Sequence, residues 1–250
     1  MPGDGEAAFI RSLADEAARH LEGKPADRIL AWATAVVPRF AVTSSFGADS
    51  AALLHLLSRV APEVPVLFLE TGFHFPETLD HRHALARDLG LTVVDVRPDL
   101  SVAQQAQRHG DALFERDPDA CCRLRKTLPL HRALANYDGW ATGVRSSQTR
   151  DRAGTPVIEA RRHDGRWLVK VAPLAAWTDE DLAAYSVQHG LPAHPLMADG
   201  YRSIGCQPCT RRVTLGEDPR AGRWPGLDKT ECGIHVPENE PAVRSDTIPG

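Results

Sequence analysis

The chain has 250 residues, of which 42% are apolar, and a formal net charge of −4 with its eleven histidines counted as neutral. A chain of this length buries about three quarters of its unfolded surface, so it needs no disulfides to fold. The acidic balance argues against strong binding to duplex DNA, which requires a basic face, but it allows a local basic pocket for a small anion.

The predicted elements alternate between helix and strand. We expect two helices within 6–37, a strand at 39–44, a helix at 51–60, a strand at 66–69, a helix at 76–89, a strand at 91–96, helices at 101–109 and 121–135, a strand at 140–144, paired strands at 157–160 and 167–171, and a helix capped by Thr178. This order predicts an α/β fold, a mostly parallel twisted sheet with helices on both faces. Ligands bind such sheets beyond the carboxyl ends of the strands.

Composition changes near the end of the chain and gives no sign of a membrane span. From Gly216 onward the sequence is rich in Pro, Gly and charge, so we expect residues 1–215 to form one α/β domain and 216–250 a flexible tail. No apolar run approaches the ~18 residues of a membrane helix. The N-terminus lacks the layout of a signal peptide, which indicates a cytoplasmic protein.

The first candidate site is the loop Ser-Ser-Phe-Gly-Ala-Asp-Ser that follows the first predicted strand. Backbone N–H groups at Gly47 and the hydroxyls of Ser44, Ser45 and Ser50 could bind a phosphate at the N-terminus of the next helix. Asp49 is a further candidate for substrate binding in this loop, although Asp49 and Ser50 could instead be ordinary helix caps. The loop is not a Walker motif, because it has no Gly-Lys-Ser/Thr.

The second candidate site is the loop at 70–78, which contains Phe73 and Phe75 and follows the second predicted strand. Aromatic rings beside backbone groups at a strand end suit a purine base. The alternative is a turn whose phenylalanines pack into the core.

The five cysteines suggest metal chemistry, because cytoplasmic thiols are normally reduced. Cys121 and Cys122 are adjacent in a predicted helix, and Cys206 and Cys209 form a C-x-x-C loop. Four thiolates suit zinc or an iron–sulfur cluster. Neighbouring helical side chains diverge by ~100°, which suits a broad cluster better than one zinc ion. A redox dithiol at 206 and 209 is the alternative.

Lys126 lies four residues after Cys122 and so on the same helical face, where it could sit between a cluster and a bound anion. The alternative is a solvated basic face.

The fifth cysteine, Cys232, lies in Glu-Cys-Gly-Ile-His near the end of the chain. A thiol in a flexible segment could swing in, attack a substrate and swing out. His235 or a cationic pocket could lower its pKa, and Glu231 would oppose this. The alternative is an incidental exposed thiol.

Arginines gather in two places, after the strand at 140–144 and after the C-x-x-C loop. Several guanidinium groups are what a sulfate and a phosphate require, although any one of them could be a surface charge. The candidates are Arg145 and Arg150 with Gln148 between them, then Arg211, Arg212, Arg220 and Arg223.

Together these motifs resemble the assimilatory sulfonucleotide reductases, in the cluster-containing adenylyl-sulfate branch. The resemblance runs from about Phe40 to His235 and rests on Cys-Cys-x-x-Arg-Lys, Cys-x-x-Cys and Glu-Cys-Gly-Ile-His in that order. The two loops Ser-Phe-Gly-Ala-Asp-Ser and Glu-Thr-Gly-Phe-His-Phe-Pro-Glu-Thr are also close to those of the family. The family is related to the adenine-nucleotide α-hydrolases, so the resemblance implies their sheet.

The resemblance implies that adenosine 5′-phosphosulfate is reduced to sulfite and AMP. It assigns a [4Fe–4S] cluster to Cys121, Cys122, Cys206 and Cys209, and the nucleophile to Cys232 with His235 nearby. It also assigns adenine contacts to the backbone of Leu69, and phosphosulfate contacts to Lys126, Arg220, Arg223 and one of Arg145 and Arg150. With four cysteines as ligands, the second thiol must come from thioredoxin or a glutaredoxin-like protein. Nothing in the sequence requires or excludes a homo-oligomer.

Three other functions remain open at this point. One is a reductase of 3′-phosphoadenylyl sulfate or of both nucleotides, although members of that type lack the paired cysteines. Another is a tRNA-thiolating ATP pyrophosphatase, in which a glycine usually stands where this chain has Phe46. The third is a zinc protein with no enzymatic activity.

Overall fold

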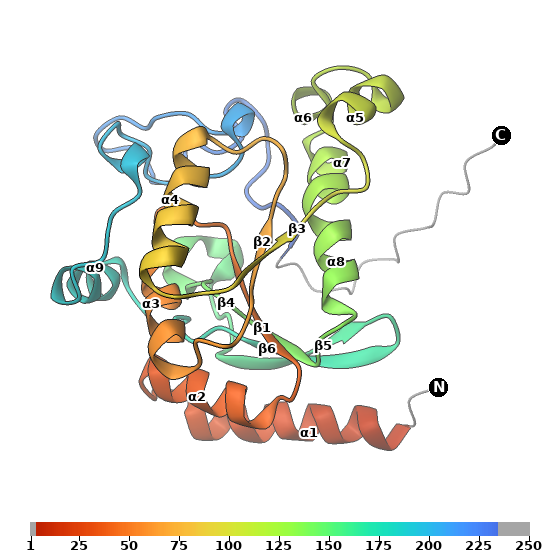
Figure 1. Ribbon diagram of the computed structural model, residues 1–250, viewed down its shortest axis with the longest axis vertical. Coiled ribbons are helices and arrows are strands. Elements are labelled where there is room, and N and C mark those ends of the chain that lie inside the picture. The colour runs from red at the N-terminus through yellow and green to blue at the C-terminus, as the bar shows by residue number, and fades with distance from the viewer. Residues whose placement is uncertain (1–3, 235–250) are drawn as a thin grey trace.

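A computed structural model of the chain describes residues 4–234. One six-stranded sheet has the order β3-β2-β1-β4-β6-β5 (Figure 1). Its strands are β1 (Phe40–Ser44), β2 (Val66–Leu69), β3 (Val93–Val96), β4 (Gly139–Thr142), β5 (Ile158–His163) and β6 (Arg166–Val171). All neighbouring strands pair in parallel except β5, which is an antiparallel edge strand on β6.

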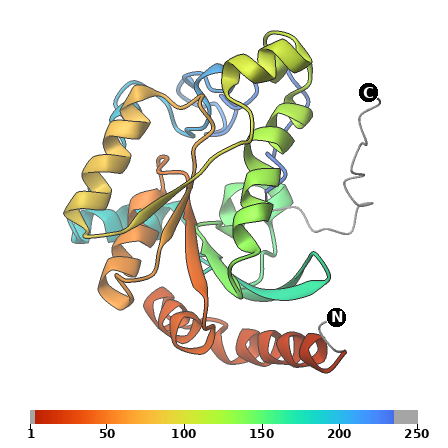
Figure 2. The ribbon, with the colours of Figure 1, turned by 45° about the vertical axis from the view of Figure 1, so that its right-hand side comes forward.

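Helices cover both faces of this sheet, with α3 and α4 on one side and α8 on the other (Figure 2). The α-helices are α1 (Asp4–Leu21), α2 (Ala26–Val36), α3 (Ser50–Val60), α4 (Pro76–Asp88), α5 (Val102–His109), α6 (Leu113–Arg116), α7 (Pro118–Cys122), α8 (Leu128–Leu134) and α9 (Asp179–Gln188). A π-helical turn, η1 (Arg123–Thr127), joins α7 to α8. Short 3₁₀ turns lie at η2 (Ser146–Gln148), η3 (Arg150–Arg152), η4 (Pro195–Met197) and η5 (Gln207–Cys209).

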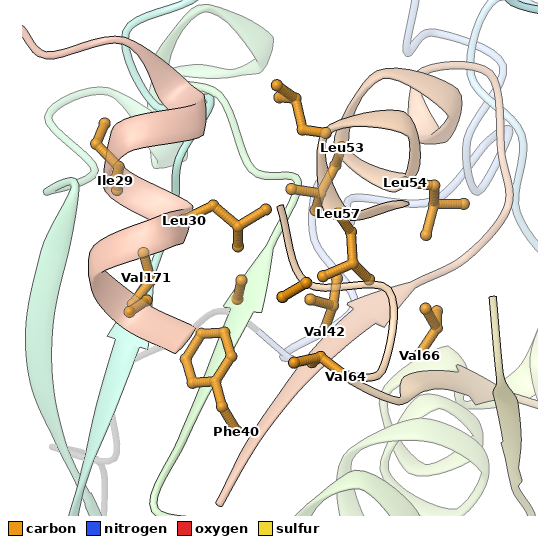
Figure 3. Packing of buried hydrophobic residues seen from close by; sticks show 14 of the residues in the cluster. Ile29, Leu30, Phe40, Val42, Leu53, Leu54, Leu57, Val64, Val66 and Val171 are labelled. Carbon is orange, nitrogen blue, oxygen red and sulfur yellow. The ribbon is translucent and has the colours of Figure 1, made fainter. Parts of the chain in front are cut away.

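The two faces of the sheet follow from the alternation of side chains along each strand. On β1, Phe40 and Val42 point into the larger core, where Leu30 of α2 and Leu57 of α3 meet them (Figure 3). Ala41, between them, faces Leu130 and Leu134 of α8 in the smaller core. Apolar residues on both faces are the pattern of a buried parallel sheet.

The predicted fold class and the order of the predicted elements are confirmed. Thr178 caps α9 as expected, since its hydroxyl accepts from the backbone N–H of Asp181 and the Asp181 carboxylate accepts in return. Two local features were not expected. Helix α6 has only four residues, which is too short to show a periodic pattern. The helix predicted at 121–135 contains the π-helical turn, because the backbone N–H of Leu128 donates to the carbonyl of Arg123, five residues earlier.

Within residues 4–234 we find no helix that is both long and apolar enough to cross a membrane.

Truncating the larger core should destabilise the protein. Leu57 is fully buried between α2, α3 and β1, so Leu57→Ala should lower the free energy of unfolding by about 2–5 kcal/mol. The measurement is the urea midpoint followed by circular dichroism. Leu215→Ala is the matched control, because Leu215 is 102% exposed and should leave the midpoint unchanged. Equal midpoints for both variants would contradict the assignment of this core.

Candidate active site

Four cysteines from two distant segments line one cavity. Cys121 and Cys122 end α7, while Cys206 precedes the short turn η5 and Cys209 ends it. All four side chains are buried, and the cavity is also lined by Phe73, Phe114, Pro118, Arg125 and Lys126. Adjacent cysteines in a helix therefore do face one site here, as the four-ligand hypothesis requires.

The loop after β2 fixes the C-x-x-C segment in place. The Phe73 carbonyl accepts from the backbone N–H of Gln207 at 2.7 Å. The Thr71 hydroxyl lies 3.4 Å from the Cys206 sulfur. Phe73 meets Phe114 edge to face, with ring centroids 5.4 Å apart. Phe75 is buried and packs in the same manner against Tyr201 at 5.3 Å. The two phenylalanines thus pack within the protein.

Burial opposes ionisation of these thiols. It raises the pKa of Cys122 to about 11 and that of Cys209 to about 12, and it also raises the pKa of Cys121. Lys126 acts in the other direction on all three. Burial by itself would lower the pKa of Lys126, but the neighbouring Cys206, Cys232 and Cys122 thiolates outweigh it and raise the pKa. Ionised sulfurs in this cavity would therefore stabilise the ammonium form of Lys126.

Cys232 lies beside this cavity and is half-buried. It packs against the group formed by Cys122, Cys206, Cys209 and Trp224. Ile234 contacts the smaller core on the face of the sheet that α8 covers. The structure thus brings the fifth cysteine next to three of the other four. His235 lies outside the described residues.

The Glu231 carboxylate is neutralised by two arginines. Arg152 donates to both of its oxygens at 2.7 Å, and Arg220 lies 3.4 Å from one of them. Trp224, which precedes Glu231 in the same segment and is only 2% exposed, also holds that segment in place. Within the described part of the expected tail, 216–234, Trp224 and Glu231 are therefore held against the site, and the proposed movement of the tail stays a prediction.

The sequence did not decide whether Arg145 or Arg150 contacts the substrate. In the structure these two arginines have different environments. Arg145 is only 3% exposed and donates to Asp49 at 2.8 Å and to Asp179 at 2.6 Å. It braces the loop after β4 against the start of α3 and α9. Arg150 is exposed in η3. Asp49 occupies the N-cap position of α3, but its carboxylate makes no cap hydrogen bond to that helix and instead accepts from Arg145 and Gln148.

The loop after β1 packs closely against the segment that leads to Cys206. A Cβ at Gly47 would lie 3.1 Å from the Ile204 carbonyl oxygen, so a larger residue would push the loop away from the segment that leads to Cys206. The Ser44 hydroxyl accepts from the Phe46 N–H at 3.1 Å. Ser45 is exposed and Ser50 half-buried at the start of α3. This places the loop next to the cysteine cavity.

Three further predicted contacts have protein partners. The Leu69 carbonyl accepts from Nε2 of His74 at 2.8 Å. Arg220 donates to the Thr230 carbonyl at 2.8 Å. Arg223 stacks on the Trp224 ring at 4.7 Å, and within the described chain its buried Nε has no hydrogen-bond partner.

Two arginines of this site were not among the predicted site residues. Arg125 is buried and donates to Gln105 at 3.0 Å and to the carbonyl of Thr71, while its guanidinium lies over the Phe73 ring. Its spacing of four from Cys121 was the available signal. Arg152 showed none, because its partner Glu231 is 79 positions away.

The chain is similar to a known protein family and to named proteins of that type. A family model described as the phosphoadenosine phosphosulfate reductase domain matches residues 39–212. The adenosine 5′-phosphosulfate reductase of Streptomyces coelicolor is 47% identical over 227 residues, which cover 90% of this chain and 94% of that protein. The adenosine 5′-phosphosulfate reductase of Mycobacterium tuberculosis is 40% identical over 244 residues, with 91% and 95% covered.

Two solved structures are also similar. Phosphoadenylyl-sulfate reductase from Candida auris, in a phosphate complex, matches with a TM-score of 0.69 and 29% identity over 80% of this chain and 96% of that one. FMN adenylyltransferase from Candida glabrata matches with a TM-score of 0.56 and 12% identity over 84% and 69%, which shows a shared fold alone.

The Glu231 ion pairs should hold the segment around Cys232 in place. Hydrogen bonds to charged groups contribute about 1.5–3 kcal/mol, so Glu231→Gln should open the segment at least about tenfold more often. Tryptic cleavage after Lys229, whose side chain is buried against Asp119, reports on the opening. Glu217→Gln is the control, because it removes an exposed pair with Arg211. Equal cleavage rates in the two variants would rule out this role of Glu231.

Proposed function

The chain belongs to the phosphoadenosine phosphosulfate reductase family, and we propose that it reduces adenosine 5′-phosphosulfate to sulfite and AMP in sulfate assimilation. One observation carries the proposal: Cys232 lies beside Lys126 and the cavity that four buried cysteines line at the carboxyl end of the sheet. Relatives that are 40–49% identical over most of the chain are named for this reaction.

The Cys232 thiolate attacks the sulfur of the phosphosulfate group. A bond forms between the two sulfurs, the bond from sulfur to the bridging oxygen breaks, and its electron pair leaves with AMP. A thiolate of thioredoxin or a glutaredoxin-like protein then attacks Sγ of Cys232 and releases sulfite. The donor's second thiol resolves the mixed disulfide, so two thiols supply the two electrons.

The obstacle to the first step is electrostatic, because an anion approaches a charged nucleotide. Lys126, Arg220 and Arg223 supply positive charge that is oriented before the reaction. The unused N–H of Arg223 supports a role in binding. Arg152 contributes indirectly by pairing with Glu231, which would otherwise repel the substrate.

The four buried cysteines fit a [4Fe–4S] cluster better than one zinc ion. A zinc–sulfur distance of about 2.3 Å holds four sulfurs about 3.8 Å apart. Cys121 and Cys122 are adjacent residues of α7, so their side chains diverge by ~100°, which suits the several irons of a cluster better than one ion. Cys121, Cys122, Cys206 and Cys209 would hold the cluster, and bound iron would keep these sulfurs ionised despite their burial.

We expect the reaction to occur in the cytoplasm, where thioredoxin-type donors are kept reduced. A 3′-phosphorylated nucleotide is the second candidate substrate, since the solved relative from Candida auris is a phosphoadenylyl-sulfate reductase. Side-by-side kinetics with both nucleotides test the choice. A kcat/KM that is higher for the 3′-phosphorylated substrate would overturn our assignment.

Two cysteine variants should separate catalysis from cluster binding. Cys232→Ser should keep the iron and its visible absorption but lower sulfite formation by roughly a thousandfold or more, because the nucleophile is lost. Cys209→Ser should lose iron and absorption together. Each variant is the control for the other, with iron content, spectrum and sulfite measured on anaerobic protein. Sulfite production by Cys232→Ser at the wild-type rate would contradict the mechanism.

The covalent intermediate should also be visible directly. Wild-type protein incubated with adenosine 5′-phosphosulfate and no thiol donor should gain one sulfonate on Cys232, because nothing removes it. Mass spectrometry of the peptide that contains residues 230–234 measures this, and added thioredoxin should discharge it. An unmodified peptide under conditions where AMP is released would exclude a Cys232 sulfonate.

A further inference from the structure

A second group of potential metal ligands lies at the opposite end of the strands from the cysteines. His131 belongs to α8, His163 ends β5, and Asp164 lies in the turn that leads to β6. One ligand atom from each lies within 4.8 Å of the other two. Because β6 begins at Arg166 and runs parallel to β4, this turn lies at the amino ends of the parallel strands. The hairpin lies beside α8 in both views (Figures 1 and 2).

The environment of His163 indicates that this group binds a ligand. It is only 5% exposed, and within the described chain its buried Nε2 has no hydrogen-bond partner. The ring's hydrogen bond to the backbone of His131 must therefore use Nδ1. Histidines that bind metals commonly donate one ring N–H to a backbone carbonyl, which directs the lone pair of the other nitrogen at the ion. A cation would also satisfy a polar atom that is otherwise costly to bury.

The other two residues are held in position by local geometry. Asp164 has φ 46° and Gly165 has φ 76°, as a tight hairpin turn with two left-handed residues requires. This turn brings Oδ1 of Asp164 to 3.3 Å from Nε2 of His131. The two imidazole rings are tilted by 40° relative to each other, with centroids 4.1 Å apart. Three donors from two elements thus converge with little freedom.

The nearby positive charge does not prevent cation binding. Arg166 lies closest in sequence, but its guanidinium pairs with Asp138 at 3.1 Å and donates to the carbonyls of Ala135 and Tyr137. Its charge is therefore largely neutralised by other partners. The carboxylate of Asp164 adds a negative charge directly at the candidate site.

We propose that His131, His163 and Asp164 bind a divalent zinc-type cation. Two imidazoles and one carboxylate are ligands that zinc accepts in tetrahedral geometry, with a fourth position left for water. The ion would join the edge hairpin to α8, whose other end continues into η1 and Lys126. The site is separate from the cysteines, so it does not depend on the proposed reaction.

Zinc binding to the intact holoprotein tests this site. Protein dialysed against EDTA and then titrated with zinc chloride should bind one zinc per chain. X-ray absorption at the zinc edge should show nitrogen and oxygen at about 2.0–2.1 Å and no sulfur at about 2.3 Å. This spectrum distinguishes the site from the cysteines whether or not the protein reduces a nucleotide. Absence of bound zinc, or a shell containing sulfur, would overturn the proposal.

Two variants assign the ligands. Asp164→Asn keeps the left-handed turn, because Asn tolerates positive φ, and should weaken zinc binding at least tenfold. His163→Gln should weaken zinc binding further. Because His163 is buried, this variant could fail to fold, and Asp164→Asn then tests the site in its place. His109→Gln, at an exposed position on α5, is the control and should bind zinc normally. Wild-type affinity in a folded Asp164→Asn would refute the assignment.

Discussion

The balance between buried sulfur and one buried ammonium group governs the carboxyl end of the sheet. Burial makes Cys122 and Cys209 hard to ionise, and it would also favour the neutral form of Lys126 unless neighbouring sulfurs carry negative charge. Neither condition arises within a single segment, because residues 121–126, 206–209 and 231–232 must first converge. The parallel sheet, with its loops after β1 and β2, provides the support that makes them converge.

Most of the fold was predictable because its signals are local. Short apolar runs gave β1 and β2, and Thr178 with Asp181 marked the start of α9. The buried sheet face and the sites at the strand ends follow from the alternating order of the elements. The short helix α6 and the π-helical turn were missed, because neither changes the hydrophobic pattern that the sequence displays.

The candidate site was predictable in its cysteines and less so in its arginines. A cysteine pattern is rare enough to be informative, whereas an arginine has no distinctive spacing. Arg145 proved to be a buried brace for Asp49, 96 positions away, and Arg152 proved to be the partner of Glu231. Such pairs are formed by tertiary structure, so residue type and spacing cannot distinguish them from surface charges.

The π-helical turn has a consequence for how this helix tolerates change. Geometrically it is one additional residue in an otherwise regular helix, so residues on either side are rotated by ~100° relative to an uninterrupted helix. Leu130 and Leu134 can therefore face the sheet while Cys121 and Cys122 face the cavity. Deleting a single residue between 123 and 127 would restore a regular helix and set these two faces out of phase. The register between sulfur and sheet thus depends on chain length here, independently of which side chains occupy the turn.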